Sequence, residues 1–195
     1  MNFTEFITEI KKLNINLTDN QENQIKTYIN KLIEYNSHTN LTAIRNYEDI
    51  LLKHFYDSLT LVKAYDFNNS LNVLDIGSGA GFPGLVIKIV FPRINLTLLD
   101  SNNKKTKFLN QIVNNLKLTN IEIINDRAEN FIKNNRETFD VVTSRAVSHL
   151  RIISELSIPY LKVGGTFLVM KTNSEEELNE SLATIKYLNS EIKEI

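Results

Sequence analysis

The feature that most constrains this chain is a short apolar segment that runs into a cluster of glycines, Val73-Leu74-Asp75-Ile76-Gly77-Ser78-Gly79-Ala80-Gly81-Phe82-Pro83-Gly84. Glycines at the end of a strand allow a sharp turn and let a ligand approach the main chain closely. Gly77, Gly79 and Gly81 form Gly-x-Gly-x-Gly. Gly79, Gly81 and Gly84 form the Gly-x-Gly-x-x-Gly typical of dinucleotide-binding proteins. The segment predicts a strand, turn and helix that bind a nucleotide-like ligand.

Two acidic residues narrow the class of ligand. Asp100 ends the second predicted strand, where a carboxylate binds the hydroxyl pair of a ribose under either glycine pattern. Asp75 stands inside the turn, where we expect its charge to repel a pyrophosphate and to suit an ammonium and a sulfonium. These residues favour S-adenosylmethionine over NAD, and they disfavour a turn with only a structural role.

The apolar spacing predicts a doubly wound α/β fold with a small helical extension in front of it. Up to residue 70 we expect helices only, one of them opened by a capping box at Thr18-Asp19-Asn20-Gln21. Beyond it strands alternate with helices, which implies a parallel sheet with right-handed crossovers and strand order 3-2-1-4-5. We expect a helical subdomain over residues 1–70 and a cofactor-binding domain over residues 71–195. The predicted strands are 71–76, 94–99, 121–124, 139–143 and 166–170, and the predicted helices include 47–65, 104–116, 128–132, 148–161 and one from Ser174 to the chain end.

Composition excludes several kinds of chemistry. The chain has no Cys, which rules out a disulfide scaffold, a Cys zinc site and thiolate catalysis. The residues His38, His54 and His149 show no metal-ligand spacing, so we expect no metal site. For His54 the spacing favours an ordinary helix-surface position, and a capping or orienting role stays open. Basic residues exceed acidic ones only within 71–171, which permits a phosphate-binding face but fits ordinary surface charge equally well. Without a membrane-length apolar run or a signal peptide, we expect a cytoplasmic protein.

In-line transfer of a methyl group from a sulfonium mainly requires that donor and acceptor are positioned correctly. Any further catalytic residues therefore depend on the chemistry of the methyl acceptor. Carbon-5 of cytosine needs a Cys nucleophile, which is absent. Transfer to an exocyclic amine usually involves an Asn/Asp-Pro-Pro-aromatic motif, where this chain has Thr143-Ser144-Arg145-Ala146. N7 of guanine carries a free lone pair and needs no base. Arg127 and Arg145 follow the third and fourth predicted strands and would hold guanine and phosphate, although a surface ion pair is the competing interpretation.

Several motifs along the chain resemble one family. The ribosomal RNA small subunit methyltransferase G family, also called glucose-inhibited division protein B, is similar to this sequence over nearly its whole length. The glycine segment is common to many methyltransferases, whereas His-Phe-Tyr-Asp-Ser and Ser-Arg-Ala are far more specific. The motifs are Tyr35-Asn36, Asn40-Leu41-Thr42-Ala43-Ile44-Arg45, His54-Phe55-Tyr56-Asp57-Ser58-Leu59, the glycine segment, Leu99-Asp100-Ser101, Lys104-Lys105, Phe108-Leu109, Arg127-Ala128-Glu129 and Ser144-Arg145-Ala146.

The resemblance implies a class I, Rossmann-like fold and a monomeric enzyme that uses S-adenosylmethionine to form 7-methylguanosine in 16S ribosomal RNA. Its partner would be that RNA or the small ribosomal subunit. It implies that Ala128 and Glu129 flank the adenine and that Arg145 lies where cofactor and guanine meet. The candidate cofactor-binding residues are Gly77, Gly79, Phe82, Asp100, Ala128, Glu129 and Arg145, and the candidate catalytic or RNA-contacting residues are Arg145, Arg127 and Lys171.

The sequence departs from the family pattern in two places. Thr172-Asn173 follows Lys171 where the family has Gly, which changes the expected local turn. The family adds an antiparallel hairpin beyond the fifth strand, so without it we expect the strand 166–170 to lie at a sheet edge. Two other functions stay open: a nicotinamide-dependent oxidoreductase using Gly79, Gly81 and Gly84, and a non-catalytic RNA- or protein-binding module that keeps the fold.

Overall fold

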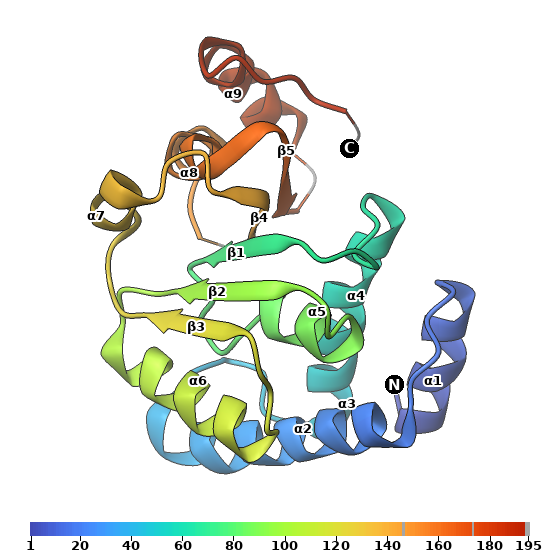
Figure 1. The fold of residues 1–195 in the computed structure, drawn as a ribbon. Coiled ribbons are helices and arrows are strands. Elements are labelled where there is room, and N and C mark those ends of the chain that lie inside the picture. Colours follow the sequence, from blue (N-terminus) through green and yellow to red (C-terminus); the bar gives the residue numbers. More distant parts are fainter. Residues whose placement is uncertain (146, 173, 194–195) are drawn as a thin grey trace.

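Five parallel strands form the centre of the molecule, in the order β3-β2-β1-β4-β5 (Figure 1). The computed structural model describes residues 1–145, 147–172 and 174–193. The predicted strand order is confirmed, and β5 lies at an edge of the described sheet. Because every pairing is parallel, the carboxyl ends of the strands meet at one edge of the sheet. The strands are β1 (Asn72–Ile76), β2 (Asn95–Leu99), β3 (Ile121–Ile124), β4 (Phe139–Arg145) and β5 (Leu161–Met170).

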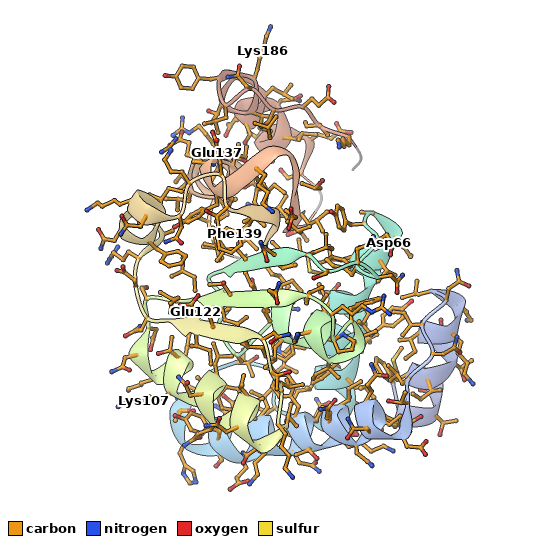
Figure 2. All side chains as sticks on the ribbon, viewed as in Figure 1. Asp66, Lys107, Glu122, Glu137, Phe139 and Lys186 are labelled. Carbon is orange, nitrogen blue, oxygen red and sulfur yellow. The ribbon has the colours of Figure 1, made fainter. Side chains whose placement is uncertain are left out.

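Two hydrophobic cores cover the two faces of the sheet. Along β1 the side chains alternate, so Val73 belongs to the larger core while Leu74 and Ile76 belong to the smaller one. Helices α1 to α6 contribute to the larger core, and α7 and α8 pack on the opposite face (Figure 1). Side chains fill the space between the sheet and the helices, including Phe139 on β4 (Figure 2). The α-helices are α1 (Phe3–Lys12), α2 (Asp19–Thr39), α3 (Tyr47–Ile50), α4 (Asp57–Leu59), α5 (Gly84–Val90), α6 (Asn103–Asn115), α7 (Ala128–Phe131), α8 (Leu150–Ser157) and α9 (Glu175–Tyr187).

The N-terminal helices follow the predicted pattern, with one change. Thr18 is the N-cap of α2, and its capping box with Gln21 is formed from both sides. The predicted helix over 47–65 is divided, because α3 continues into the π-helical turn η1 (Leu51–Tyr56) before α4 begins. The larger core joins residues from both sides of residue 70, and the boundary of the two predicted domains at that residue stays a prediction. The remaining short helices are the 3-10 turns η2 (Thr60–Lys63), η3 (Ile132–Asn134) and η4 (Ile158–Tyr160).

The carboxyl-terminal elements differ from the predicted boundaries. Both β4 and β5 are longer than predicted. The added part of β5 contains Gly164 and Gly165, which give no strand signal. The predicted helix to the chain end is wrong, since α9 stops at Tyr187. Residues 194–195, together with Ala146 of the Ser-Arg-Ala motif and Asn173, lie outside the described residues. Within the described part of the chain, no helix combines the length and apolar content of a membrane span.

The N-terminal cap of α9 is formed from one side only. Ser174 is the N-cap of α9, and its hydroxyl accepts the Glu177 N–H at 3.2 Å. The Glu177 carboxylate does not return to the cap, because it accepts the Leu150 N–H at 2.5 Å and pairs with Lys171. Glu177 therefore connects the start of α9 to the start of α8 and to the residue after β5.

Candidate active site

The strand register brings three predicted site residues to one edge of the sheet. Ile76 at the end of β1 pairs with Leu99 of β2 on one side and with Ser144 of β4 on the other. The residues that follow these three positions are Gly77, Asp100 and Arg145. They therefore leave the sheet next to each other, where ligands bind in open parallel sheets.

A cavity of about 440 Å³ opens at this edge, within the range of about 300–1,000 Å³ that is usual for ligand sites. Its wall consists of the glycine loop, the ends of β2 and β4, the start of α7 and a segment before η1. Every residue predicted to bind the cofactor lies on this wall, and so does Arg127. The predicted lining residues are Gly77, Gly79, Phe82, Asp100, Arg127, Ala128, Glu129 and Arg145, and those not predicted as site residues include Leu41, Thr42, His54, Ser78, Ala80, Ser101, Lys105, Asp126 and Val147.

The first half of the glycine loop faces the cavity. Gly77 and Gly79 have φ values of +69° and +60°, in the left-handed region that favours glycine. The Gly77 N–H donates to the Leu99 carbonyl at 2.8 Å, and the Gly79 N–H donates to Asp100 Oδ2 at 2.9 Å. A Cβ at Gly79 would lie 3.8 Å from the nearest neighbouring atom, the Gly77 carbonyl oxygen, so this stretch of main chain is open to a ligand.

The two later glycines of the loop face the larger core, whereas Phe82 between them also lines the cavity. A Cβ at Gly81 would overlap the Tyr28 hydroxyl, and one at Gly84 would lie 2.7 Å from Asp75 Oδ2. Neither glycine lines the cavity. Of the two overlapping glycine patterns, only Gly77 and Gly79 therefore reach the ligand side.

The predicted role of Asp75 opposite the ligand is wrong. Alternation along β1 directs this fully buried carboxyl towards α5, beneath the loop and away from the cavity wall. Its Oδ2 accepts the Gly84 N–H at 2.8 Å, and its Oδ1 has no hydrogen-bond partner among the described residues. Burial raises the pKa of Asp75 to about 7. Asp75 therefore supports the loop from below and does not discriminate between ligands by direct contact.

Asp100 connects β2 to the glycine loop. Besides the bond from Gly79, its Oδ1 accepts the Asn102 N–H at 2.8 Å, and Lys105 Nζ lies 3.5 Å from Oδ2. The residue is 5% exposed and lines the cavity. An ionised carboxylate has about four acceptor positions, so it retains capacity for a ribose hydroxyl. Its role in ribose binding stays a prediction.

Arg145 is held from several sides at the other end of the cavity. Its Nη1 donates to the Lys53 carbonyl at 2.9 Å and lies 3.3 Å from Asp57 Oδ2. Its Nη2 lies 2.8 Å from His54 Nδ1, and the guanidinium carbon lies 5.2 Å from the centre of the Phe82 ring. These contacts join β4 to the N-terminal helical segments and fix the guanidinium before any ligand binds.

The predicted surface position of His54 is wrong, because this side chain is only 8% exposed. Its ring stacks on Phe82 with centroids 4.5 Å apart, and Phe82 stacks on Tyr28 at 5.5 Å. Burial, with a smaller effect from the Arg145 charge, lowers the pKa of His54 to about 4. Helical spacing gave no sign of this contact, although the His-Phe-Tyr-Asp-Ser motif contains both His54 and Asp57.

The two other predicted basic residues lie in different surroundings. Arg127 is the N-cap of α7 and lines the cavity, and no ion pair is recorded for it among the described residues. Lys171 lies away from the cavity wall, where it donates to the Ser148 carbonyl at 2.7 Å and pairs with Glu177. The roles of both residues in RNA contact stay predictions.

Two solved structures with a similar fold are named as methyltransferases. A putative methyltransferase from Bacillus halodurans has a TM-score of 0.58 at 18% identity, over 71% of this chain and 70% of that one. The precorrin-6y C5,15-methyltransferase of Geobacter metallireducens has a TM-score of 0.55 at 16% identity, over 68% and 70%. The sheet order, the glycine loop and these likenesses define a class I methyltransferase fold.

Sequence comparison gives the family. The family model described as rRNA small subunit methyltransferase G matches residues 21–195. The protein of that name from Oceanobacillus iheyensis is 43% identical over 194 residues, which cover 98% of this chain and 82% of that protein. The one from Staphylococcus haemolyticus is 45% identical over 191 residues, which cover 96% and 80%. The chain belongs to the ribosomal RNA small subunit methyltransferase G family. It is an S-adenosylmethionine-dependent methyltransferase, and the oxidoreductase alternative is no longer needed.

Proposed function

We propose that this chain transfers the methyl group of S-adenosylmethionine to N7 of a guanine in 16S ribosomal RNA. The observation that carries the proposal is a cavity that has an open glycine loop, Asp100 and a tethered Arg145 together on its wall. The partner is the RNA itself or the small ribosomal subunit, and the enzyme acts as a monomer in the cytoplasm. Residues 71–195 form the cofactor-binding domain.

The described residues fit the cofactor at the glycine loop. Gly79 offers main chain without a side chain in the way, and Asp100 stands beside it with acceptor capacity for ribose hydroxyls. Ser78 lines the cavity, while its hydroxyl is buried and has no partner within the described residues. Ala128 and Glu129 would flank the adenine.

At the Arg145 end of the cavity, the side chains can orient the substrate, and the proposed reaction needs no general base. When bound, S-adenosylmethionine supplies an electrophilic methyl group on a sulfonium. The lone pair of guanine N7 is free at neutral pH, so no side chain has to remove a proton. This agrees with His54, whose Nδ1 faces Arg145 and whose pKa of about 4 makes it a poor base at neutral pH. Arg145 retains guanidinium donors for guanine or phosphate, and Arg127 is placed to contact phosphate.

The test is transfer of a labelled methyl group to free 16S RNA and to assembled small subunits. We expect 7-methylguanosine in the nucleoside digest of one of the two substrates. Arg145→Ala should reduce transfer by at least about 100-fold, which corresponds to roughly 2.8 kcal/mol in the transition state. The exposed Arg136, on a turn before β4, provides the matched control Arg136→Ala, which should retain activity. A different methylated nucleoside would contradict the proposal. RNA binding without transfer would favour the non-catalytic module.

A further inference from the structure

We propose that His54 is a positioning residue that fixes the Arg145 guanidinium and, through the same ring, makes the Thr42 hydroxyl a hydrogen-bond donor to the target base. The inference rests on the proposed function, because it concerns the base that receives the methyl group. It is carried by a chain of three side chains, Arg145, His54 and Thr42, which the structure joins at 2.8 Å and 2.9 Å.

The direction of each hydrogen bond in this chain follows from the donors that each group carries. A guanidinium has donors only, so His54 Nδ1, which lies 2.8 Å from Arg145 Nη2, has to accept. A neutral imidazole that accepts at Nδ1 carries its proton at Nε2. Nε2 lies 2.9 Å from Thr42 Oγ1, and this contact is therefore a bond that His54 donates to Thr42. Arg145 thus selects the tautomer of His54.

Thr42 receives a second bond, which decides the orientation of its own proton. The Ile44 N–H also donates to Thr42 Oγ1, at 3.2 Å. Two accepted bonds occupy the two lone pairs of a hydroxyl oxygen, so the remaining interaction of this hydroxyl is donation. Among the described residues no acceptor for that proton is recorded, and Thr42 lines the cavity. The hydroxyl is therefore available as a donor to an acceptor atom of a bound molecule.

The main chain at Thr42 is held in place independently of His54. The side chain of Asn36, which is 3% exposed, donates to the Thr42 carbonyl at 2.9 Å and accepts the Thr42 N–H at 3.0 Å. Both backbone groups of Thr42 are thus tied to α2 through one buried amide. A donor that is fixed by its neighbours costs little entropy when a ligand bonds to it, which is what a recognition group requires.

The place of Thr42 favours the base over the cofactor as its partner. The residues predicted to hold adenosine, Asp100 and Ala128, lie beyond the ends of β2 and β3. Thr42 is joined instead to Arg145 at the end of β4, on the side of the N-terminal helices. A guanine that presents N7 also presents its O6 acceptor on the same edge. A donor at Thr42 would hold O6 and leave N7 free to receive the methyl group.

Nitrogen NMR tests the His54 arrangement without any enzymatic activity. The chain has only three histidines, so substitution of His38 or His149 assigns their signals. We expect His54 to show the Nε2–H tautomer and no titration between pH 8 and pH 5.5. Arg145 from β4 and Asp57 from α4 are the charged groups that face this cluster, and Arg145→Gln should raise the pKa of His54. An Nδ1–H tautomer, or titration at the ordinary histidine value near 6.5, would overturn the proposal.

Paired variants test the donor at Thr42. Thr42→Val should lower kcat/KM for RNA about 10-fold while the Kd of S-adenosylmethionine, measured by calorimetry, changes less than about twofold, and Thr42→Ser should restore most of the loss. Thr8→Val is the matched control, because Thr8 lies exposed on α1. Equal activity of Thr42→Val and wild type would overturn the donor. So would an equal loss of cofactor affinity, since the hydroxyl would then serve the cofactor.

A second pair separates the two bonds of His54. The amide of His54→Asn places an oxygen where the ring has Nδ1, whereas His54→Gln reaches only the Nε2 position. We expect His54→Asn to retain at least about fivefold more kcat/KM than His54→Gln, and equal values would overturn the positioning of Arg145. If the wild type transfers no methyl group to RNA, the proposed function fails, while the nitrogen spectrum still decides whether His54 couples Arg145 to Thr42.

Discussion

Each half of the glycine loop contributes two glycines, and the two pairs have opposite tasks. Gly77 and Gly79 line the cavity, whereas Gly81 and Gly84 pack against Tyr28 and Asp75 of the larger core. In the first half, the missing side chain leaves space for a ligand at Gly79 and for Val147 of the cavity wall at Gly77. In the second half it keeps space for the protein itself. Substitutions in the two halves should therefore affect different measurements, binding in one case and unfolding in the other.

The largest expected effect is on folding, from Gly81→Ala. The residue has φ +98°, where a side chain is strained, and its Cβ would overlap the Tyr28 hydroxyl. Strain and overpacking together predict a loss of about 3–4 kcal/mol in the free energy of unfolding. Urea denaturation measures this loss. If Gly81→Ala instead unfolds like wild type and binds the cofactor poorly, the division of the loop into two halves is wrong.

Next in size is an effect on binding, from Gly77→Val. A Cβ at Gly77 would lie 2.5 Å from Val147 Cγ2, and the branched side chain would occupy the approach to the loop. We expect affinity for S-adenosylmethionine to fall at least about 100-fold, roughly 2.8 kcal/mol, while circular dichroism still shows a folded chain. Gly164→Val is the matched control, because Gly164 also has a positive φ (+81°) but lies on β5 outside the cavity wall, and its Cβ meets nothing within 4 Å. Unchanged affinity in a folded Gly77→Val variant would contradict the ligand-facing assignment.

Asp75 lies beneath the second half of the loop, and its ionisation should make the free energy of unfolding depend on pH. Its folded pKa of about 7 lies above the unfolded value, so its contribution is greatest at low pH and declines as pH rises from about 4 to 7. His54, with a folded pKa of about 4, has the opposite slope between about pH 4 and 6.5, because the unfolded chain takes up its proton first. In the wild type the two slopes largely cancel.

Replacing either Asp75 or His54 should reveal how the other residue changes stability with pH. Relative to wild type, Asp75→Asn should make stability rise more steeply with pH between about 4.5 and 6, by up to roughly 1.4 kcal/mol per pH unit. His54→Asn should change the slope in the opposite direction. Urea unfolding at several pH values measures both variants. Curves for Asp75→Asn that run parallel to wild type would show that this carboxyl is not protonated in the folded state.

The elements of the fold could be predicted from the sequence because local signals determine them. The capping box at Thr18, the apolar strand before Gly77 and the alternation of strands with helices each depend on neighbouring residues. The errors arose where tertiary contacts extend or divide an element. β5 includes Gly164 and Gly165 because it pairs with β4, and η1 interrupts a helix whose spacing looked regular.

The cavity wall was predictable only where a family motif or a strand end marked the residue. Gly77, Asp100 and Arg145 follow strand ends, so topology alone brings them together. The sequence did not predict as well which way a side chain points relative to the sheet. Asp75 was expected to face the ligand and faces α5, and His54 was expected on the surface and stacks on Phe82. The His54 error concerns long-range packing that one sequence does not display. For Asp75, alternation places the side chain on the same face as Val73, and the strand alone does not show that α5 covers this face.

Two basic side chains show the same contrast, since one lines the cavity and the other pairs within the protein. Their substitution should give the smallest effect of those predicted here, on RNA affinity. Arg127 lines the cavity, whereas Lys171 is paired with Glu177 between α8 and α9. Arg127→Ala should weaken binding of 16S RNA about three- to tenfold, with a reduced dependence on salt, because one phosphate contact is lost. Lys171→Ala should change RNA affinity less than twofold and lower stability instead, because Glu177 loses its partner. Fluorescence anisotropy at several salt concentrations, with urea unfolding alongside, compares the two variants. If Lys171→Ala proves the weaker binder, Glu177 releases Lys171 when RNA arrives, and this lysine belongs with the ligand-facing residues.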